Sequence, residues 1–327
     1  MPLHPQAEAF LKQLQDEGTP AFYEMSVLEA RAFEAGLEEI QGDVQEVAEV
    51  RDILVPGEGD AGEIPVRIYN PAPGKTLPLV IYLHGGGWVM GSIAVVDRPC
   101  RELANAAECM VAAVGYRLSP ETKFPGPVED CYAATRWLVE HADEVGFDRG
   151  QVGISGDSAG GNLAAAVTLM ARDRGGPHIS YQLLLYPVTA PEHESPHQSY
   201  VDNGEGYMVT RGDMRWFWEH YVTSIEQARD PYASPLLADD LTGLPPGMVI
   251  TAEFDPLRDE GIAYAERLQN AGVDIELKVF PGAIHGFFWM NGVMDFGHEL
   301  LGDLASFIKG WSAKAATATG AQGETDG

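Results

Sequence analysis

The sequence predicts an α/β protein built on a mostly parallel sheet, and two observations lead to this prediction. Short apolar runs that suit buried strands alternate with amphipathic, helix-like segments through most of the chain. Strands that alternate with helices require a parallel sheet with both faces covered. The composition agrees, because 45% hydrophobic and 21% charged residues form an ordinary globular mixture that excludes collagen-like, coiled-coil and wholly disordered chains.

The first part of the chain changes from helical to strand-like periodicity. Apolar residues recur at helical spacing over residues 5–40, and the Gly-Thr-Pro run at 18–20 interrupts them, which predicts two amphipathic helices. Residues 44–70 instead alternate between polar and apolar side chains, as in the Val-Arg-Ile-Tyr run at 66–69. Such alternation is typical of antiparallel strands with one face in solvent.

Buried strands and helices then follow one another. The apolar run at 77–83 suits a strand that is covered on both faces. Further strands are expected at 110–114, 152–155, 181–186, 248–252 and 275–280, and helices at 128–141, 159–172, 261–271 and 298–311.

Two stretches depart from this pattern. Residues 189–244 are rich in aromatic and charged side chains and hold no buried strand, which predicts an inserted, mostly helical subdomain. Residues 313–327 carry no large apolar side chain that could offset the entropy cost of ordering, so we expect a disordered tail there. The remaining segments, 46–188 and 245–312, are then expected to form the main α/β domain.

A serine stands at a sharp turn between a strand and a helix. The run Gly156-Asp157-Ser158-Ala159-Gly160 follows the strand at 152–155 and precedes a helix-forming segment. Small residues on both sides of a serine allow a strained elbow that lifts its hydroxyl above the end of the strand. The sequence therefore predicts Ser158 as a nucleophile, with a glycine-rich turn as the structural alternative.

A serine nucleophile needs a histidine base and a carboxylate that orients it. Among the histidines downstream of Ser158, His285 follows a predicted strand directly, whereas the others lie in the insertion, before a strand or at the start of the last helix. The strand before that one is followed by Glu253, Asp255 and Asp259. We predict His285 as the base and Asp255 as its orienter, with Glu253 and Asp259 as structural acids.

Acyl transfer also needs hydrogen-bond donors for the oxygen that becomes negative. Three glycines, Gly85, Gly86 and Gly87, follow the strand at 77–83, where the absence of a Cβ allows close approach of backbone N–H groups. Gly86, Gly87 and Ala159 are the predicted oxyanion donors, with Gly85 as the substitute. The Gly-Lys-Ser/Thr run of a phosphate-binding loop does not follow these glycines.

With these residues in place, the chain resembles the hormone-sensitive lipase family of bacterial carboxylesterases, often called family IV, and its GDSAG subgroup. The resemblance covers roughly residues 65–310 and rests on five motifs. They are HGGGW at 84–88, YRLSPE at 116–121, GDSAGG at 156–161, DPLRD at 255–259 and HGF at 285–287.

The resemblance implies the α/β-hydrolase fold, with a mostly parallel eight-stranded sheet flanked by helices. It also implies a helical cap made from residues 1–45 and 189–244, the same triad and oxyanion donors, and a possible homodimer.

The predicted function is hydrolysis of short- to medium-chain acyl esters through an acyl-enzyme. An amide, lactone or carbamate substrate on the same triad stays open, as does a non-catalytic ligand-binding relative. Trp88 and Tyr207 are candidate substrate contacts, although the aromatic residues of the insertion also suit its own core. We expect no metal and no organic cofactor.

Charge and cysteine content indicate the surroundings of the protein. A net charge of −28 repels phosphate backbones and anionic lipids, so neither nucleic acid nor membrane is an expected partner. Three cysteines without metal-ligand spacing, and no apolar stretch of membrane-spanning length, predict a cytoplasmic protein with reduced thiols. The acidity also suggests adaptation to salt, with a solvated helical face as the simpler explanation.

Overall fold

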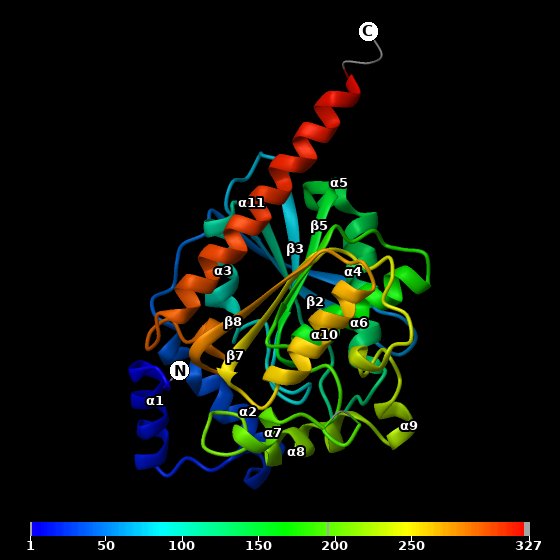
Figure 1. Ribbon diagram of the computed structural model, residues 1–327. Coiled ribbons are helices and arrows are strands. Elements are labelled where there is room, and N and C mark those ends of the chain that lie inside the picture. The colour runs from blue at the N-terminus through cyan, green and yellow to red at the C-terminus, as the bar shows by residue number, and fades with distance from the viewer. Residues whose placement is uncertain (1, 195, 324–327) are drawn as a thin grey trace.

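One mixed sheet runs through the centre of the molecule (Figure 1). In the computed structural model, which describes residues 2–194 and 196–323, the sheet has eight strands in the order β1-β2-β4-β3-β5-β6-β7-β8. β2 pairs antiparallel with both β1 and β4, and the other neighbours are parallel, which confirms the predicted sheet. The bounds are β1 Glu49–Pro56, β2 Glu63–Asn70, β3 Leu77–Leu83, β4 Met110–Val114, β5 Phe147–Asp157, β6 Tyr181–Leu185, β7 Gly247–Phe254 and β8 Ile275–Ile284.

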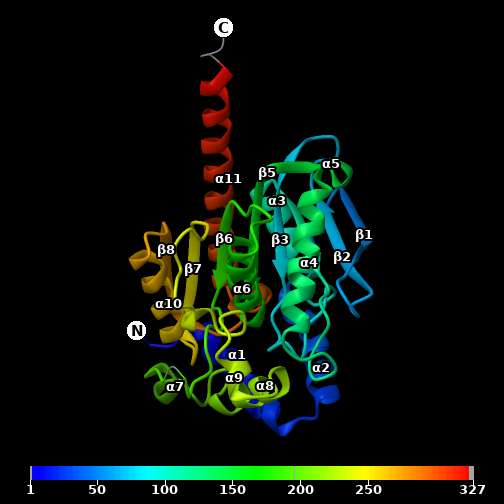
Figure 2. The same cartoon turned by 90° about the vertical axis from the view of Figure 1, so that its right-hand side faces the viewer.

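Helices cover both faces of the sheet, as strands buried on two sides require (Figure 2). In β3, Leu79 and Ile81 join the core under one set of helices, while Val80 and Tyr82 join the core on the other face. The first face is covered by α4 (Gly126–Glu140), α6 (Ala159–Asp173) and α10 (Arg258–Asn270), and the second by α3 (Asp97–Ala107) and α11 (Phe296–Gly323).

Helix α3 is an element that the sequence patterns did not predict. Its buried stripe includes Cys100, Leu103 and Ala107 and packs on the sheet, but charged residues dominate the rest of the helix. Pro99 lies in its first turn, where a missing backbone N–H costs no intrahelical hydrogen bond. The helix is strongly amphipathic, so its periodicity is present in the sequence although no helix was predicted there.

The predicted disordered tail is corrected in part. Helix α11 continues through residues 313–323 and projects away from the sheet (Figure 1), while residues 324–327 lie outside the described residues. The segment is rich in alanine, which has the highest helix propensity, and adding residues to an existing helix avoids the cost of nucleation. A lack of large apolar side chains therefore does not prevent helix formation here.

A helical layer lies beyond the carboxyl ends of the strands, and two distant parts of the chain form it (Figures 1 and 2). The backbone N–H of Tyr23 donates to Asp213 Oδ1 at 3.0 Å, and the rings of Phe22 and Phe217 lie 5.8 Å apart. The helices of this layer are α1 (Pro5–Asp16), η1 (Phe22–Glu24), α2 (Val27–Gly36) and η2 (Leu37–Gln41), together with α7 (Ser199–Asp202), α8 (Arg211–Tyr221), α9 (Ile225–Ala228) and η3 (Pro235–Leu237).

Side-chain caps fix where the longer helices of this layer begin. Ser26 and Glu29 form a reciprocal capping box at the start of α2, and Thr210 and Asp213 form one at the start of α8. Within the described part of the chain, none of the helices is both long enough and apolar enough to cross a membrane.

Candidate active site

Ser158 lies at the elbow between β5 and α6, in a conformation that few side chains adopt. Its backbone has φ 56° and ψ −119°. A Cβ added to Gly156 would collide with the backbone of Gly160, and a Cβ on Gly160 would collide with the carbonyl of Leu83. The elbow therefore needs small residues on both sides of the serine, and the side chain of Ser158 is held at the end of the sheet.

Three predicted residues from different loops meet at this elbow. His285 Nε2 lies 2.9 Å from Ser158 Oγ, and His285 Nδ1 lies 2.7 Å from Asp255 Oδ2. Asp255 is fully buried, and its second oxygen accepts the backbone N–H of Leu257 at 2.8 Å. With Nδ1–H donated to Asp255, the Nε2 lone pair of His285 points at the Ser158 hydroxyl, which is the geometry a general base needs.

The two acids that were predicted to be structural, Glu253 and Asp259, each hold a loop through a backbone N–H. Glu253 Oε2 accepts the backbone N–H of Gly282 at 2.7 Å, just before the loop that carries His285. Asp259 Oδ2 accepts the backbone N–H of Ser199 at 2.8 Å and so joins α10 to α7. Neither carboxylate is hydrogen-bonded to His285 in the described part of the chain.

The glycine loop after β3 faces Ser158 with free backbone donors. Gly86 has φ 100° and Gly87 φ 58°, and a Cβ on Gly87 would collide with the ring of Phe217. Within residues 2–194 and 196–323, the N–H groups of Gly86, Gly87 and Ala159 have no protein acceptor. The N–H of Gly85, by contrast, donates to Asp157 Oδ1 at 3.1 Å, so Gly85 cannot serve as the substitute donor.

His84 and Tyr116 hold the backbone of this loop in place. Burial lowers the pKa of His84 to about 4, so the ring is neutral. It stacks on Tyr116 with ring centroids 4.2 Å apart, its Nδ1 lies 2.8 Å from the carbonyl of Gly85, and Tyr116 donates to the carbonyl of His84 at 2.8 Å. These contacts fix the backbone immediately before the free amides.

A narrow cavity of about 50 Å³ lies between Ser158 and the helical layer. Its lining combines the catalytic candidates with apolar side chains from both parts of the layer. The lining includes Phe22, Glu34, Leu37, His84, Gly86, Gly87, Met90, Val209, Phe217, His285 and Trp289.

The two candidate substrate contacts lie elsewhere. Trp88 is fully buried and stacks on Tyr221 at 4.1 Å, so the prediction that it contacts substrate is wrong; it packs the core below the loop. Tyr207 lines a neighbouring groove, which shares Phe22 and Met208 with the cavity at Ser158. A contact between Tyr207 and a substrate would therefore involve the outer part of that substrate.

Two polar residues of the helical layer form hydrogen bonds to loops of the site, and the sequence patterns did not predict either of them. Glu34 of α2 lines the cavity and accepts the backbone N–H of Gly91. Asn203 follows α7 and donates to the carbonyls of Glu253 and Asp255 at 3.1 and 3.2 Å. Both contacts join segments more than 45 residues apart in the sequence, and no local pattern marks them.

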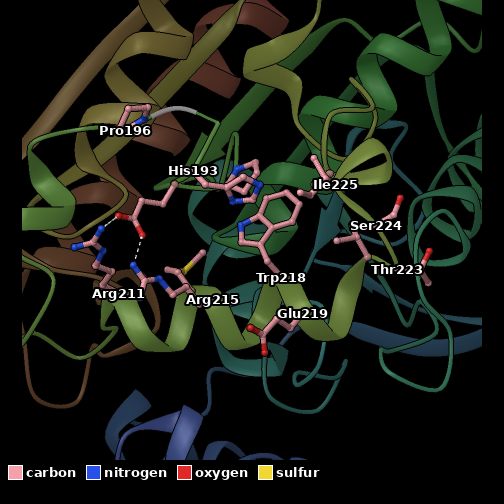
Figure 3. Close-up of a pocket in the computed structure, with 14 residues that line it drawn as sticks. His193, Pro196, Arg211, Arg215, Trp218, Glu219, Thr223, Ser224 and Ile225 are labelled. Carbon is pink, nitrogen blue, oxygen red and sulfur yellow. Dashed lines mark hydrogen bonds and ion pairs between the residues drawn. The ribbon is translucent and has the colours of Figure 1, made fainter.

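A second pocket, of about 650 Å³, is lined partly by residues of α8, among them Arg211, Arg215 and Trp218 (Figure 3). Trp218 is part of its wall, whereas the preceding residue, Phe217, faces the cavity at Ser158. Glu192 pairs there with Arg211 and, at 3.3 Å, with Arg215. Among the described residues of this lining, no serine is hydrogen-bonded to a histidine, and Ser158 and His285 line the smaller cavity instead.

Comparison with known proteins places this geometry in a family. A family model described as the alpha/beta hydrolase fold matches residues 80–289, which include Ser158, Asp255 and His285. The chain belongs to the α/β-hydrolase family. This agrees with the resemblance to the hormone-sensitive lipase family, while the GDSAG subgroup stays a prediction.

Relatives within the α/β-hydrolases cover most of the chain. A carboxylic ester hydrolase of Mycobacterium tuberculosis, LipN, is 42% identical over 270 residues, which are 80% of this chain and 71% of LipN. An ethyl acetate hydrolase of Pseudomonas putida is 36% identical over 91% of this chain and 96% of its own. The solved structure of a hyperthermophilic esterase from the archaeon Pyrobaculum calidifontis is 40% identical, with a TM-score of 0.90 over 95% of this chain and 99% of that one.

Proposed function

We propose that the protein is a carboxylic ester hydrolase that works through an acyl-enzyme on Ser158. The observation that carries this proposal is the chain of short contacts from Asp255 through His285 to Ser158, next to three backbone amides that have no acceptor among the described residues. The names of the relatives support it, since LipN, the Pseudomonas putida protein and the archaeal structure are all described as ester hydrolases or esterases.

The proposed reaction has two halves. In the first, His285 takes the proton of Ser158 while Oγ attacks the ester carbonyl, and the amides of Gly86, Gly87 and Ala159 bind the resulting oxyanion. Protonated His285 then gives its proton to the leaving alcohol. In the second half, His285 removes a proton from water, which attacks the acyl-enzyme. Protonated His285 then returns the proton to Ser158 Oγ as the carboxylic acid is released.

Turnover of p-nitrophenyl butyrate by the wild type and by Ser158→Ala tests the proposal. Loss of the nucleophile should lower kcat by about 10³-fold or more. Ser306→Ala, on the exposed side of α11, is the matched control and should keep the wild-type rate. Equal rates for Ser158→Ala and the wild type would overturn the proposal, and a Ser158 that a fluorophosphonate probe fails to label would favour a non-catalytic ligand-binding protein.

The cavity supports a preference for short- to medium-chain acyl groups. Phe22, Phe217 and Trp289 line the cavity at Ser158, whose volume is about 50 Å³. A p-nitrophenyl ester series from C2 to C16 should therefore show falling kcat/KM as the acyl chain lengthens beyond the medium range. The same preparation should be assayed on matched amides, lactones and carbamates, because the triad alone does not select among these leaving groups.

We further propose that residues 1–45 and 189–244 act as a cap over a catalytic domain formed by 46–188 and 245–312. Contacts between η1 and α8 support a single covering layer.

A further proposal is a homodimer that forms through α11 and through β8, which lies at one edge of the sheet. Sedimentation would test it. Three buried free thiols and the net charge of −28 support a cytoplasmic protein without nucleic-acid partners.

A further inference from the structure

Helix α2 contacts the glycine loop through two side chains that lie one helical turn apart. Arg31 Nε donates to the carbonyl of Val89 at 2.8 Å. The carboxyl group of Glu34 accepts the backbone N–H of Gly91. Residues three apart share one face of a helix, so this face of α2 presents a donor and an acceptor to two backbone groups of the same loop.

The backbone groups that α2 holds belong to the turn that carries the free amides. The carbonyl of Gly86 accepts the N–H groups of Val89 and Met90 at 3.1 and 2.8 Å, so residues 86–90 form one hydrogen-bonded turn. A Cβ on Gly86 would collide with the carbonyl of Met90, which shows how tightly the turn is closed. A shift of residues 89–91 would therefore shift the amides of Gly86 and Gly87.

Both side chains of α2 are themselves held in place. The guanidinium of Arg31 also donates to the carbonyl of Ser119 at 2.9 Å and pairs with Glu121 at 2.7 Å. Glu34 is only 7% exposed, and burial raises the pKa of its carboxyl to about 8. Near neutral pH it is therefore mostly uncharged and places little negative charge beside the developing oxyanion.

We propose that Arg31 and Glu34 are positioning residues that fix the oxyanion loop, so that helix α2 contributes to transition-state stabilisation as well as covering the pocket. The proposal rests on the proposed ester hydrolysis and adds to it a role for residues outside the triad and the glycine motif. It requires that loss of either contact act on the bound oxyanion and leave ground-state binding nearly unchanged.

The test compares two variants of Glu34. Glu34→Leu removes the hydrogen-bond acceptor but keeps a side chain of similar size, whereas Glu34→Gln keeps a neutral acceptor. Arg31→Met keeps most of the apolar stem and removes the donor to Val89. For each variant we would measure kcat and KM on p-nitrophenyl butyrate and the Ki of an alkyl trifluoromethyl ketone, whose adduct with Ser158 carries an oxyanion. Melting temperatures would verify that every variant is folded at the assay temperature.

We expect Glu34→Leu and Arg31→Met to lower kcat by about 10- to 100-fold and to raise the Ki by a similar factor, with KM within about threefold of the wild type. Glu34→Gln should stay within about threefold of the wild type in all three quantities. Glu29→Ala, which removes the capping contact to Ser26 on the same helix, is the control and should keep the wild-type kcat and Ki.

Unchanged kcat and Ki in Glu34→Leu and Arg31→Met would overturn the proposal. It would also be overturned if Glu34→Gln were as impaired as Glu34→Leu, or if Glu29→Ala lowered kcat to the same extent, because the effect would then reflect general damage to α2. A wild-type protein that turns over no ester would instead refute the proposed function, so the two failures are distinguishable.

Discussion

At the scale of single residues, a buried carboxyl group makes the stability of the fold depend on pH. Glu260 of α10 is fully buried, accepts the backbone N–H of Thr189 at 2.7 Å and receives the hydroxyl of Tyr200 at 2.9 Å. Burial raises its pKa to about 8. The group is thus neutral in the folded protein at pH 7 and ionised in the unfolded chain.

The sign of the pH effect follows from proton linkage. Between the ordinary glutamate pKa and about 8, the folded state binds more protons than the unfolded state, so the free energy of unfolding falls as pH rises through this window. Glu260→Gln mimics the protonated acid, and we expect it to match the wild type near pH 5 but to be more stable at pH 9 by on the order of a few kcal/mol.

Thermal unfolding from pH 5 to pH 9 would measure this difference. Glu266→Gln, on the exposed side of the same helix, is the control and should follow the wild-type curve. Parallel curves for Glu260→Gln and the wild type would show that Glu260 does not hold an extra proton in the folded state.

At the scale of elements, the inserted segment holds the loop that carries Asp255. Asn203 is 4% exposed and donates to the carbonyls of Glu253 and Asp255, and Ser199 Oγ donates to the carbonyl of Pro256 at 2.7 Å. Together with the contacts of α2, these bonds mean that both parts of the helical layer are tied to loops of the active site.

We expect Asn203→Ala to destabilise the protein by about 1–3 kcal/mol, because two buried carbonyls lose their donor. It should also lower kcat by about tenfold, since the carboxylate that orients His285 loses its support. Denaturant unfolding and ester turnover would measure the two effects. Asp202→Asn, at the exposed neighbouring position, should change neither, and a stable Asn203→Ala with wild-type kcat would contradict this account.

At the scale of the whole molecule, negative charge is concentrated in the N-terminal part of the chain. Residues 1–63 hold 15 acidic and three basic residues, and the complete chain has a net charge of −28. Exposed charges of one sign repel one another and oppose the compact state, and salt screens this repulsion over about 10 Å at 0.1 M. The N-terminal helices, which belong to the helical layer, should be affected most.

We therefore expect the melting temperature and the esterase activity to rise from low salt to molar NaCl. A variant with Glu39→Gln, Asp43→Asn and Glu46→Gln removes three exposed charges and should show a smaller rise. Flat or falling values for the wild type would show that the acidity is a solvated surface without a role in salt adaptation.

The sequence by itself determined the elements that follow local rules. Apolar runs such as 77–83 specify strands buried on both faces, and the small residues around Ser158 specify its elbow, because each depends on neighbours in the chain. Ser158, Asp255 and His285 follow the parallel strands β5, β7 and β8, and this order was enough to predict that they meet, since parallel strands end at one edge of the sheet. The Gly86–Gly87 turn was also predictable, because it depends on consecutive glycines in the chain.

Only the tertiary structure decided what depends on packing between distant segments. It placed Trp88 in the core on Tyr221, assigned the N–H of Gly85 to Asp157, and brought Glu34, Arg31 and Asn203 to loops of the site. A side chain pairs with whatever group the fold brings within hydrogen-bond distance, and that distance is fixed by the packed layers and not by sequence spacing. Local sequence thus specified the reacting groups, and the tertiary packing specified what holds them in position.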